Sequence, residues 1–196
     1  MNKLKKLLLT ITLTISVITL PVAAGAAPYT VQKGDSFWSI ANENGVSVLN
    51  LLNTNNRTGS LLYAGETINI PDASVSQEDK ELMAKLIHAE AKGEPYAGKV
   101  AVGTVILNRV DHEDFPNTIK SVIYERSNGY YAFSPVQDGA INGGYTDGDM
   151  KAVNEAIAFR GQGNGSLFFY NPKTAQSNWI ESRDHTITIG NHVFAK

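Results

Sequence analysis

Cysteine is absent from the 196 residues of this sequence. Without cysteine, the chain can form no disulfide, offers no thiol nucleophile and cannot build a thiolate metal site. Two catalytic motifs are missing as well: no HExxH pattern is present, and Ser134 has no GxSxG context. We therefore expect no metal and no cofactor, because no ligand spacing links the four histidines, which are His88, His112, His185 and His192.

Positive charge is also scarce. The sequence has 17 Lys and Arg against 19 Asp and Glu, a net charge of −2 with His neutral. Three of the Lys and none of the acidic residues lie within residues 1–27, so the rest of the chain has a net charge of −5. With no basic patch in the sequence, we expect no nucleic-acid partner.

Only one long hydrophobic run occurs, from Leu7 to Leu20. Lysines precede it, and Pro21 and the small residues VAAGAA follow it, which is the pattern of a secretory signal peptide. A retained membrane anchor is the alternative, but the run is short for a spanning helix and contains Thr and Ser. We expect residues 1–27 to be removed, with cleavage between Ala24 and Pro28, leaving an exported chain with no membrane span.

Residues 28–71 predict a very small domain with the order strand, helix, helix, strand. The strands are expected at 29–32 and 66–70. The first helix begins after Asp35 or Ser36 and ends at a glycine, and the second begins after Ser47. The inward side chains are predicted to be Phe37, Ile40 and Ala41 in the first helix, and Val48, Leu49 and Leu52 in the second.

This segment resembles the LysM family. The matching motifs are Tyr29-Thr30-Val31, Gly34-Asp35-Ser36, Trp38-Ser39-Ile40-Ala41, Leu52-Asn53 and the run from Tyr63 to Pro71. The resemblance implies a βααβ module that holds peptidoglycan or chitin glycan in a shallow groove. Three polar residues could bind sugar amides there, although each is equally plausible as a cap or turn residue. They are Asp35, Ser36 and Asn53.

Residues 72–75 form a short link that would let the two modules swivel without separating widely. Ser76 and Asp79 then resemble a capping box that begins a helix, and Gly93 and Pro95 end it. At 100° per residue, the apolar side of this helix is made of Leu82, Met83, Leu86 and Ile87.

Glu90 projects into the middle of that apolar side. Burial would disfavour its ionised form and raise its pKa, as a general acid working near neutral pH requires. The alternative is a partly exposed or Arg-paired Glu at a helix end. Glu94 is the obvious second carboxylate, four residues further on, but Gly93 and Pro95 flank it. Glu94 could equally accept hydrogen bonds from backbone N–H groups of a loop.

The rest of the second module, residues 76–196, is predicted to be mainly helical with a few short C-terminal strands. Helices are expected over 96–109, where Gly103 allows close packing, over 118–124 with Asn117 as cap, and over 147–159. A strand at 167–170 and a hairpin of 186–189 with 192–194 follow. Residues 130–145 are expected to be a structured loop, a natural place for a binding cleft.

This module resembles the SleB/CwlJ family of cell-wall hydrolases. The matching segments, in order, are 88–95, 98–102, 106–110, Phe115-Pro116, Phe133-Ser134, 169–172, Trp179 and 189–194. The resemblance implies an α+β protein with a lysozyme-like catalytic domain that acts on spore cortex or vegetative peptidoglycan. The catalytic Glu of the family falls on Glu90. We accordingly expect a monomeric protein that is secreted and associated with the cell wall or the cortex.

The remaining candidates are aromatic and amide side chains that could hold sugar rings and N-acetyl groups: Tyr130, Tyr131, Phe133, Tyr170, Trp179 and Asn171. Packing in the core and turn formation are their alternative roles. With one Glu the enzyme could be a lytic transglycosylase, and with a second carboxylate it could be a muramidase. A cell-wall amidase or a non-catalytic peptidoglycan-binding protein are the alternatives to glycan cleavage.

Overall fold

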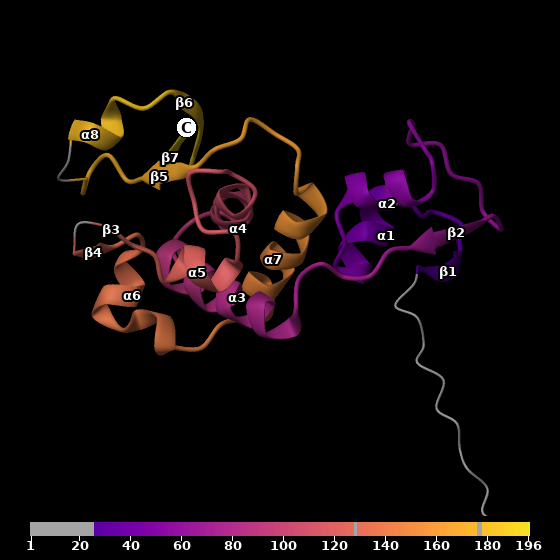
Figure 1. Ribbon diagram of the computed structural model, residues 1–196, viewed down its shortest axis with the longest axis horizontal. Helices are drawn as coiled ribbons and strands as arrows, with labels where there is room; N and C mark the ends of the chain where they lie inside the picture. The colour runs from indigo at the N-terminus through magenta and orange to yellow at the C-terminus, as the bar shows by residue number, and fades with distance from the viewer. Residues whose placement is uncertain (1–25, 128, 176–177) are drawn as a thin grey trace, which may run out of the picture.

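The structure is a computed structural model that describes residues 26–127, 129–175 and 178–196. The predicted signal peptide lies outside these residues, apart from residues 26 and 27. The two modules lie side by side along the long axis of the molecule, and the first is drawn in indigo and violet in Figure 1. Within the described residues, no helix is long and apolar enough to cross a membrane.

The first module has the predicted βααβ order. It contains β1 (Ala27–Thr30), α1 (Phe37–Asn44), α2 (Val48–Thr54) and β2 (Thr67–Ile70). The two strands pair antiparallel, with Tyr29 opposite Ile68. Ser36 caps α1 in a capping box with Ser39, and Gly45 ends that helix in the left-handed conformation at φ 64°. The predicted sequence signals for the first helix are thus confirmed.

One prediction for the second helix is wrong. Leu51 is the buried residue of α2, whereas Leu49 is 39% exposed. Val48 and Leu52 pack only partly against the core. Because α2 is just two turns long, its apolar residues occur on more than one side, and the packing of α1 and β2 decides which side is inward.

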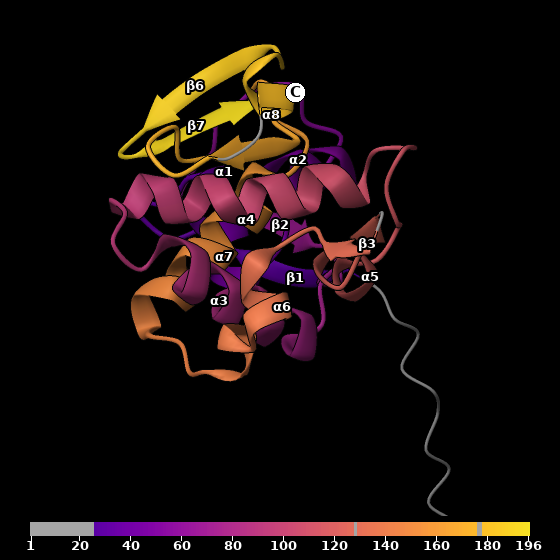
Figure 2. The same cartoon turned by 90° about the vertical axis from the view of Figure 1, so that its left-hand side faces the viewer.

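The second module is built on α3 (Gln77–Ala91), α4 (Tyr96–Val110), α5 (Ile119–Ile123) and α7 (Asp147–Phe159). Figure 2 shows α4 lying between a small sheet on one side and α3 with α7 on the other. Gly103 lies at a close helix contact as predicted, and the neighbouring helix is α7, because a Cβ there would lie 2.9 Å from the Cβ of Ala156. The glycine therefore permits the close approach of the two helices.

The smaller elements surround these helices. They are β3 (Arg126–Ser127), β4 (Tyr130–Tyr131), α6 (Ser134–Asp138), a 3-10 turn (Ala140–Asn142), β5 (Phe168–Tyr170), α8 (Asn178–Glu181), β6 (His185–Ile189) and β7 (His192–Ala195). The last three strands form an antiparallel sheet in the order β5-β7-β6, which includes the predicted hairpin.

Three details differ from the sequence prediction. The expected loop at 130–145 contains β4 and α6, and α8 was not predicted. The cap of α5 is Thr118 and not Asn117, since the Thr118 hydroxyl accepts from the N–H of Ser121. Elements as short as β4, α6 and α8 show little periodicity, which explains the first two differences. The third arises because Asn117 and Thr118 are adjacent residues that can both cap a helix.

The two modules pack against each other through α1 and α7. Ala158 of α7 is fully buried within the hydrophobic core of the first module. A Cβ on Gly161 would lie 3.0 Å from Leu49 Cδ1, and Lys80 of α3 contacts Gly45. The expectation of swivelling modules was wrong, because it considered the link at 72–75 alone and not this contact.

Candidate active site

Glu90 lies in the last turn of α3, beside the buried residues Leu86 and Ile87. The helix runs from its Ser76 cap with Met83, Leu86 and Ile87 fully buried, so the predicted apolar side is confirmed. Burial, and to a smaller extent the negative charge of Asp138, raises the pKa of Glu90 to about 7 against the opposing effect of Arg109. Near neutral pH a large fraction of Glu90 is therefore protonated and able to donate.

Arg109 is the positively charged residue that lowers the pKa of Glu90. It is 6% exposed, and its Nε donates to the carbonyl oxygen of Leu167 at 2.7 Å. Its guanidinium lies 5.0 to 5.5 Å from the ring centres of Phe115, Phe133 and Phe168. Burial lowers the pKa of Arg109 to about 10, and the negative charges of Glu125 and Glu90 oppose that shift.

A cleft of about 830 Å³ opens between the β3–β4 hairpin on one side and β5 with α8 on the other. These elements lie at the end of the molecule remote from the first module (Figure 1). Arg109, whose positive charge lowers the pKa of Glu90, forms part of the wall of the cleft. The lining residues are Arg109, Phe115, Glu125, Ser127, Tyr130, Tyr131, Ala132, Phe168, Phe169, Trp179 and Ile180.

Glu94 lies in the turn between α3 and α4, where it contacts the β6–β7 hairpin. Its Oε2 accepts from the N–H of Asn191 at 2.9 Å, and its Oε1 accepts from Asn191 Nδ2 at 3.1 Å. Partial burial raises its pKa, but the two hydrogen bonds from Asn191 and the charge interaction with His192 together outweigh that effect, so the pKa is lowered overall. Gly190 must be glycine here, because a Cβ would collide with Glu94 Oε2 and Pro95. The arrangement is that of a loop anchor, the second of the two roles predicted for Glu94.

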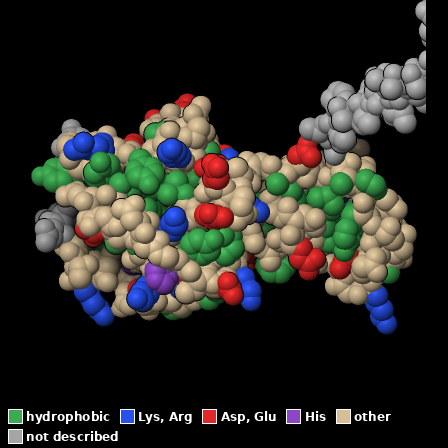
Figure 3. Space-filling model, turned by 90° about the horizontal axis from the view of Figure 1, so that it is seen from below, with side chains coloured by type: hydrophobic (Ala, Val, Ile, Leu, Met, Phe, Trp, Pro, Cys, Tyr) green, Lys and Arg blue, Asp and Glu red, His purple; other side chains and the backbone are tan. Residues whose placement is uncertain are grey.

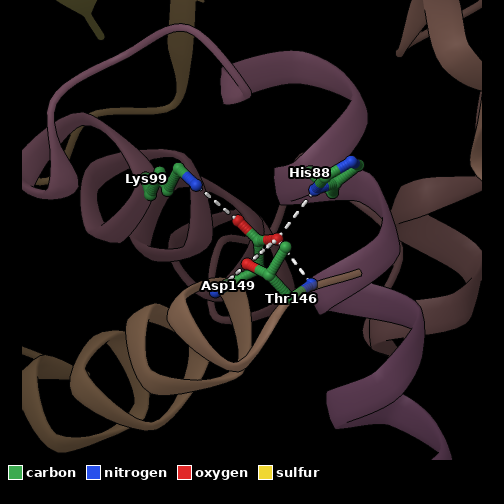
Figure 4. A network of polar contacts seen from close by, with 4 residues as sticks. All are labelled: His88, Lys99, Thr146 and Asp149. Carbon is green, nitrogen blue, oxygen red and sulfur yellow. Dashed lines mark hydrogen bonds and ion pairs between the residues drawn. The ribbon is translucent and has the colours of Figure 1, made fainter. Parts of the chain in front are cut away.

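A buried polar network holds the helix that carries Glu90 (Figure 4). Asp149 of α7 is fully buried, and Lys99 Nζ donates to its Oδ1 at 2.7 Å. His88 Nδ1 lies 2.8 Å from Asp149 Oδ2, which also accepts from the N–H and hydroxyl of Thr146. Burial alone would raise the pKa of Asp149, but these donors lower it well below its usual range. The network joins α3, α4 and the start of α7. Its member on α3, His88, lies two residues before Glu90.

Comparison with known proteins agrees with this architecture. A family model described as Cell Wall Hydrolase matches residues 93–195, and the LysM domain model matches residues 29–71. The chain belongs to the cell wall hydrolase family. The match begins just C-terminal to Glu90 and includes Glu94, Arg109 and the whole cleft.

Curated relatives of this chain include spore cortex-lytic enzymes. The chain is 43% identical to the enzyme of Bacillus cereus over 128 residues, which are 65% of this chain and 48% of that protein. It is 42% identical to the enzyme of Oceanobacillus iheyensis over 130 residues, 66% of this chain and 45% of that protein. The chain thus spans about half the length of these relatives.

A solved structure is also similar to this chain. It is the catalytic domain of the germination-specific lytic transglycosylase SleB from Bacillus anthracis, with a TM-score of 0.56 and 42% sequence identity. The similarity covers 63% of this chain and 98% of that domain. The mainly helical second module is therefore the part that the two proteins share.

The structure separates the predicted aromatic residues into two groups. Tyr130, Tyr131 and Trp179 line the cleft. Tyr130 is 70% exposed and Trp179 is 54% exposed, so both rings are open to a ligand. Phe133 is only 2% exposed and packs against Phe169. Tyr170 is half-buried at the end of β5 and does not line the cleft.

The predicted polar binding residues are mostly engaged within the protein. Asn171 Oδ1 accepts from the N–H of Lys173 at 3.0 Å, which forms a turn. Asp35 Oδ2 accepts from the Tyr29 hydroxyl at 2.8 Å and from the N–H of Gln32 at 2.7 Å. Ser36 is the N-cap of α1. Asn53 is exposed on α2.

Two residues of the candidate site, Arg109 and Glu125, were not predicted from the sequence. Arg109 follows Val102 and Val105 by seven and four residues, so it falls on the buried side of α4. The test that singled out Glu90 would also have found Arg109. Glu125 lines the cleft, and no sequence signal places it there. Among the described residues, no group of three His, Asp or Glu side chains is placed to hold a metal ion.

Proposed function

We propose that this chain is a secreted enzyme that cleaves the glycan strand of peptidoglycan in the cell wall or spore cortex. Glu90 is its general acid. The observation that carries the proposal is a half-buried Glu with a pKa near 7, whose charged neighbour Arg109 lines a cleft with exposed aromatic rings. The kinship with spore cortex-lytic enzymes and with a lytic transglycosylase domain supports the same substrate.

The chemistry begins with proton transfer from Glu90 to the glycosidic oxygen as its bond to C1 breaks. The sugar then has oxocarbenium character, and Glu90 is left as a carboxylate. Arg109 stabilises that carboxylate because its positive charge lowers the pKa of Glu90. Glu90 then takes a proton from the 6-hydroxyl of the same sugar as that oxygen attacks C1, which gives a 1,6-anhydro product. Glu94 takes no part in this route, because Asn191 occupies both of its oxygens.

The first module is proposed to hold the enzyme on its insoluble substrate. Tethering raises the local concentration of the catalytic module, so weak glycan binding by residues 28–71 is sufficient to increase wall lysis. Because α1 packs on α7, this tether lies in direct contact with the catalytic module.

Mass spectrometry of the soluble fragments released from purified peptidoglycan and cortex tests the proposal. Fragments with anhydro-muramic ends are the expected result. Reducing ends would show hydrolysis and require a base in addition to Glu90. Free stem peptides without glycan cleavage would instead identify an amidase, and binding without any release would identify an accessory protein.

The pH dependence of glycan cleavage should follow the protonation of Glu90. Since only the protonated acid can donate, kcat/KM is expected to fall as the pH rises through about 7. Replacing Asp138 with Asn removes a negative charge that raises the pKa of Glu90, so the alkaline limb should move to lower pH. Asp114→Asn, at an exposed loop position, is the matched control. An unchanged limb in Asp138→Asn would contradict the assignment.

A further inference from the structure

Glu125 lies between Tyr124, the C-cap of α5, and the first residue of β3. Its carbonyl oxygen accepts from the N–H of Ala132 at 2.9 Å, and its own N–H donates to the carbonyl of Val122 at 3.4 Å. Both backbone polar groups of Glu125 are thus hydrogen-bonded, which fixes the position from which its side chain extends. The side chain is half-buried and forms part of the cleft wall.

The neighbouring cation does not neutralise Glu125. Arg126 donates from its guanidinium to the carbonyl of Gly129 at 3.1 Å and lies 4.9 Å from the ring centre of Tyr131. Within the described part of the chain, the ion pairs join other residues, and none includes Glu125. Glu125 interacts at longer range with Arg109 in the wall of the cleft, where its negative charge raises the pKa of Arg109. The carboxylate is thus a hydrogen-bond acceptor at the edge of the cleft.

The rings beside Glu125 suit a sugar. Tyr130 and Trp179 line the same cleft and expose 70% and 54% of their surface. Trp179 is held in place by an edge-on contact with Phe168 and by Arg183, which lies 4.5 Å from its ring centre. Exposed rings offer apolar faces to the C–H face of a sugar, and a carboxylate next to them accepts from hydroxyl or amide groups.

We propose that Glu125 is a substrate-binding residue, which accepts hydrogen bonds from a hydroxyl or acetamido N–H of a sugar held against Tyr130 and Trp179. The inference rests on the proposed function, because it takes a glycan strand as the occupant of the cleft. It adds a charged contact to a site that otherwise binds through aromatic rings.

Tryptophan fluorescence allows a direct test, because the sequence contains only Trp38 and Trp179. Trp38 lies in the first module, so the variant Trp38→Phe leaves Trp179 as the single reporter of the cleft. Adding Glu90→Gln prevents turnover during a titration with a soluble N-acetylglucosamine–N-acetylmuramic acid tetrasaccharide. In that background, Glu125→Ala is expected to raise the Kd at least about tenfold, the size of a lost charge-assisted hydrogen bond. Glu125→Gln, which keeps an acceptor oxygen, should lose less.

Glu113→Ala is the matched control, since Glu113 is exposed on the loop after α4 and outside the cleft. A Kd for Glu125→Ala within twofold of its parent overturns the inference. A normal Kd together with a loss of cleavage above a hundredfold also overturns it, because Glu125 would then act on the reacting atoms. Fragment release by the wild-type protein tests the proposed function separately. If no glycan fragments are released from peptidoglycan, the proposed function fails, whereas release with an unchanged Kd for Glu125→Ala overturns only the role of Glu125.

Discussion

Replacing Glu90 with Gln is expected to lower the rate of glycan cleavage by about a thousandfold, the size of a general-acid contribution. Gln has the same shape but cannot donate a carboxyl proton to the leaving oxygen. Fragment release from purified peptidoglycan measures the rate, and sedimentation with insoluble wall measures binding. Binding should be retained, because the first module is unchanged.

The variant should also be well folded. The pKa of Glu90 is raised in the folded chain, so its contribution to stability is full below pH 4.5 and is lost as the pH rises through about 7. Glu90→Gln removes that loss, and at pH 8 its free energy of unfolding should equal or exceed that of the wild type. Glu81→Gln, on the outer side of the same helix, is the control for cleavage. If Glu90→Gln keeps a tenth of the activity, Glu90 is not the acid.

Replacing Asp149 with Asn is expected to lower the free energy of unfolding by about 3–5 kcal/mol, as removal of one partner of a buried ion pair does. The Asp149 side chain is fully buried, and the Lys99 side chain is only 17% exposed. Neutralising Asp149 leaves that ammonium group with no charged partner and weakens the bonds from His88 and Thr146. Urea denaturation at pH 7 measures the change.

The exposed pair between Arg160 and Asp111 provides the control for this prediction. Arg160 donates to both Asp111 oxygens, at 2.9 and 2.6 Å, but the Asp111 side chain is 45% exposed. Asp111→Asn should therefore cost no more than about 1 kcal/mol. Folding lowers the pKa of Asp149, so its contribution to the free energy of unfolding should be full above the pKa of the unfolded chain. That contribution should be lost only as the pH falls through the lower pKa of the folded chain. Similar losses in the two variants would contradict a special role for Asp149.

Patterns within one segment were sufficient for much of the fold. The 3.6-residue spacing in α3 identified both its buried side and Glu90 as the charge that interrupts it. The same spacing in α4 placed Gly103 at a helix contact. These predictions succeeded because a long amphipathic helix encodes its own orientation.

Short segments did not allow such predictions. Leu49 and Leu51 lie two residues apart in a two-turn helix, and only the position of α1 and β2 decides which is buried. The role of Glu94 depended on Asn191, which lies 97 residues away along the chain. No local pattern contains information about a partner at that distance.

The sequence by itself determined the two modules, their longer helices and the acidic residue on which the proposed chemistry depends, because all of these follow from local spacing and resemblance. The tertiary structure decided what surrounds that residue. It brought Asp138 and Arg109 near Glu90, buried Asp149 among donors from three helices, and placed Glu125 beside exposed rings. Charges and desolvation act through space, so the pKa of an acid is determined by neighbours that the order of residues does not reveal.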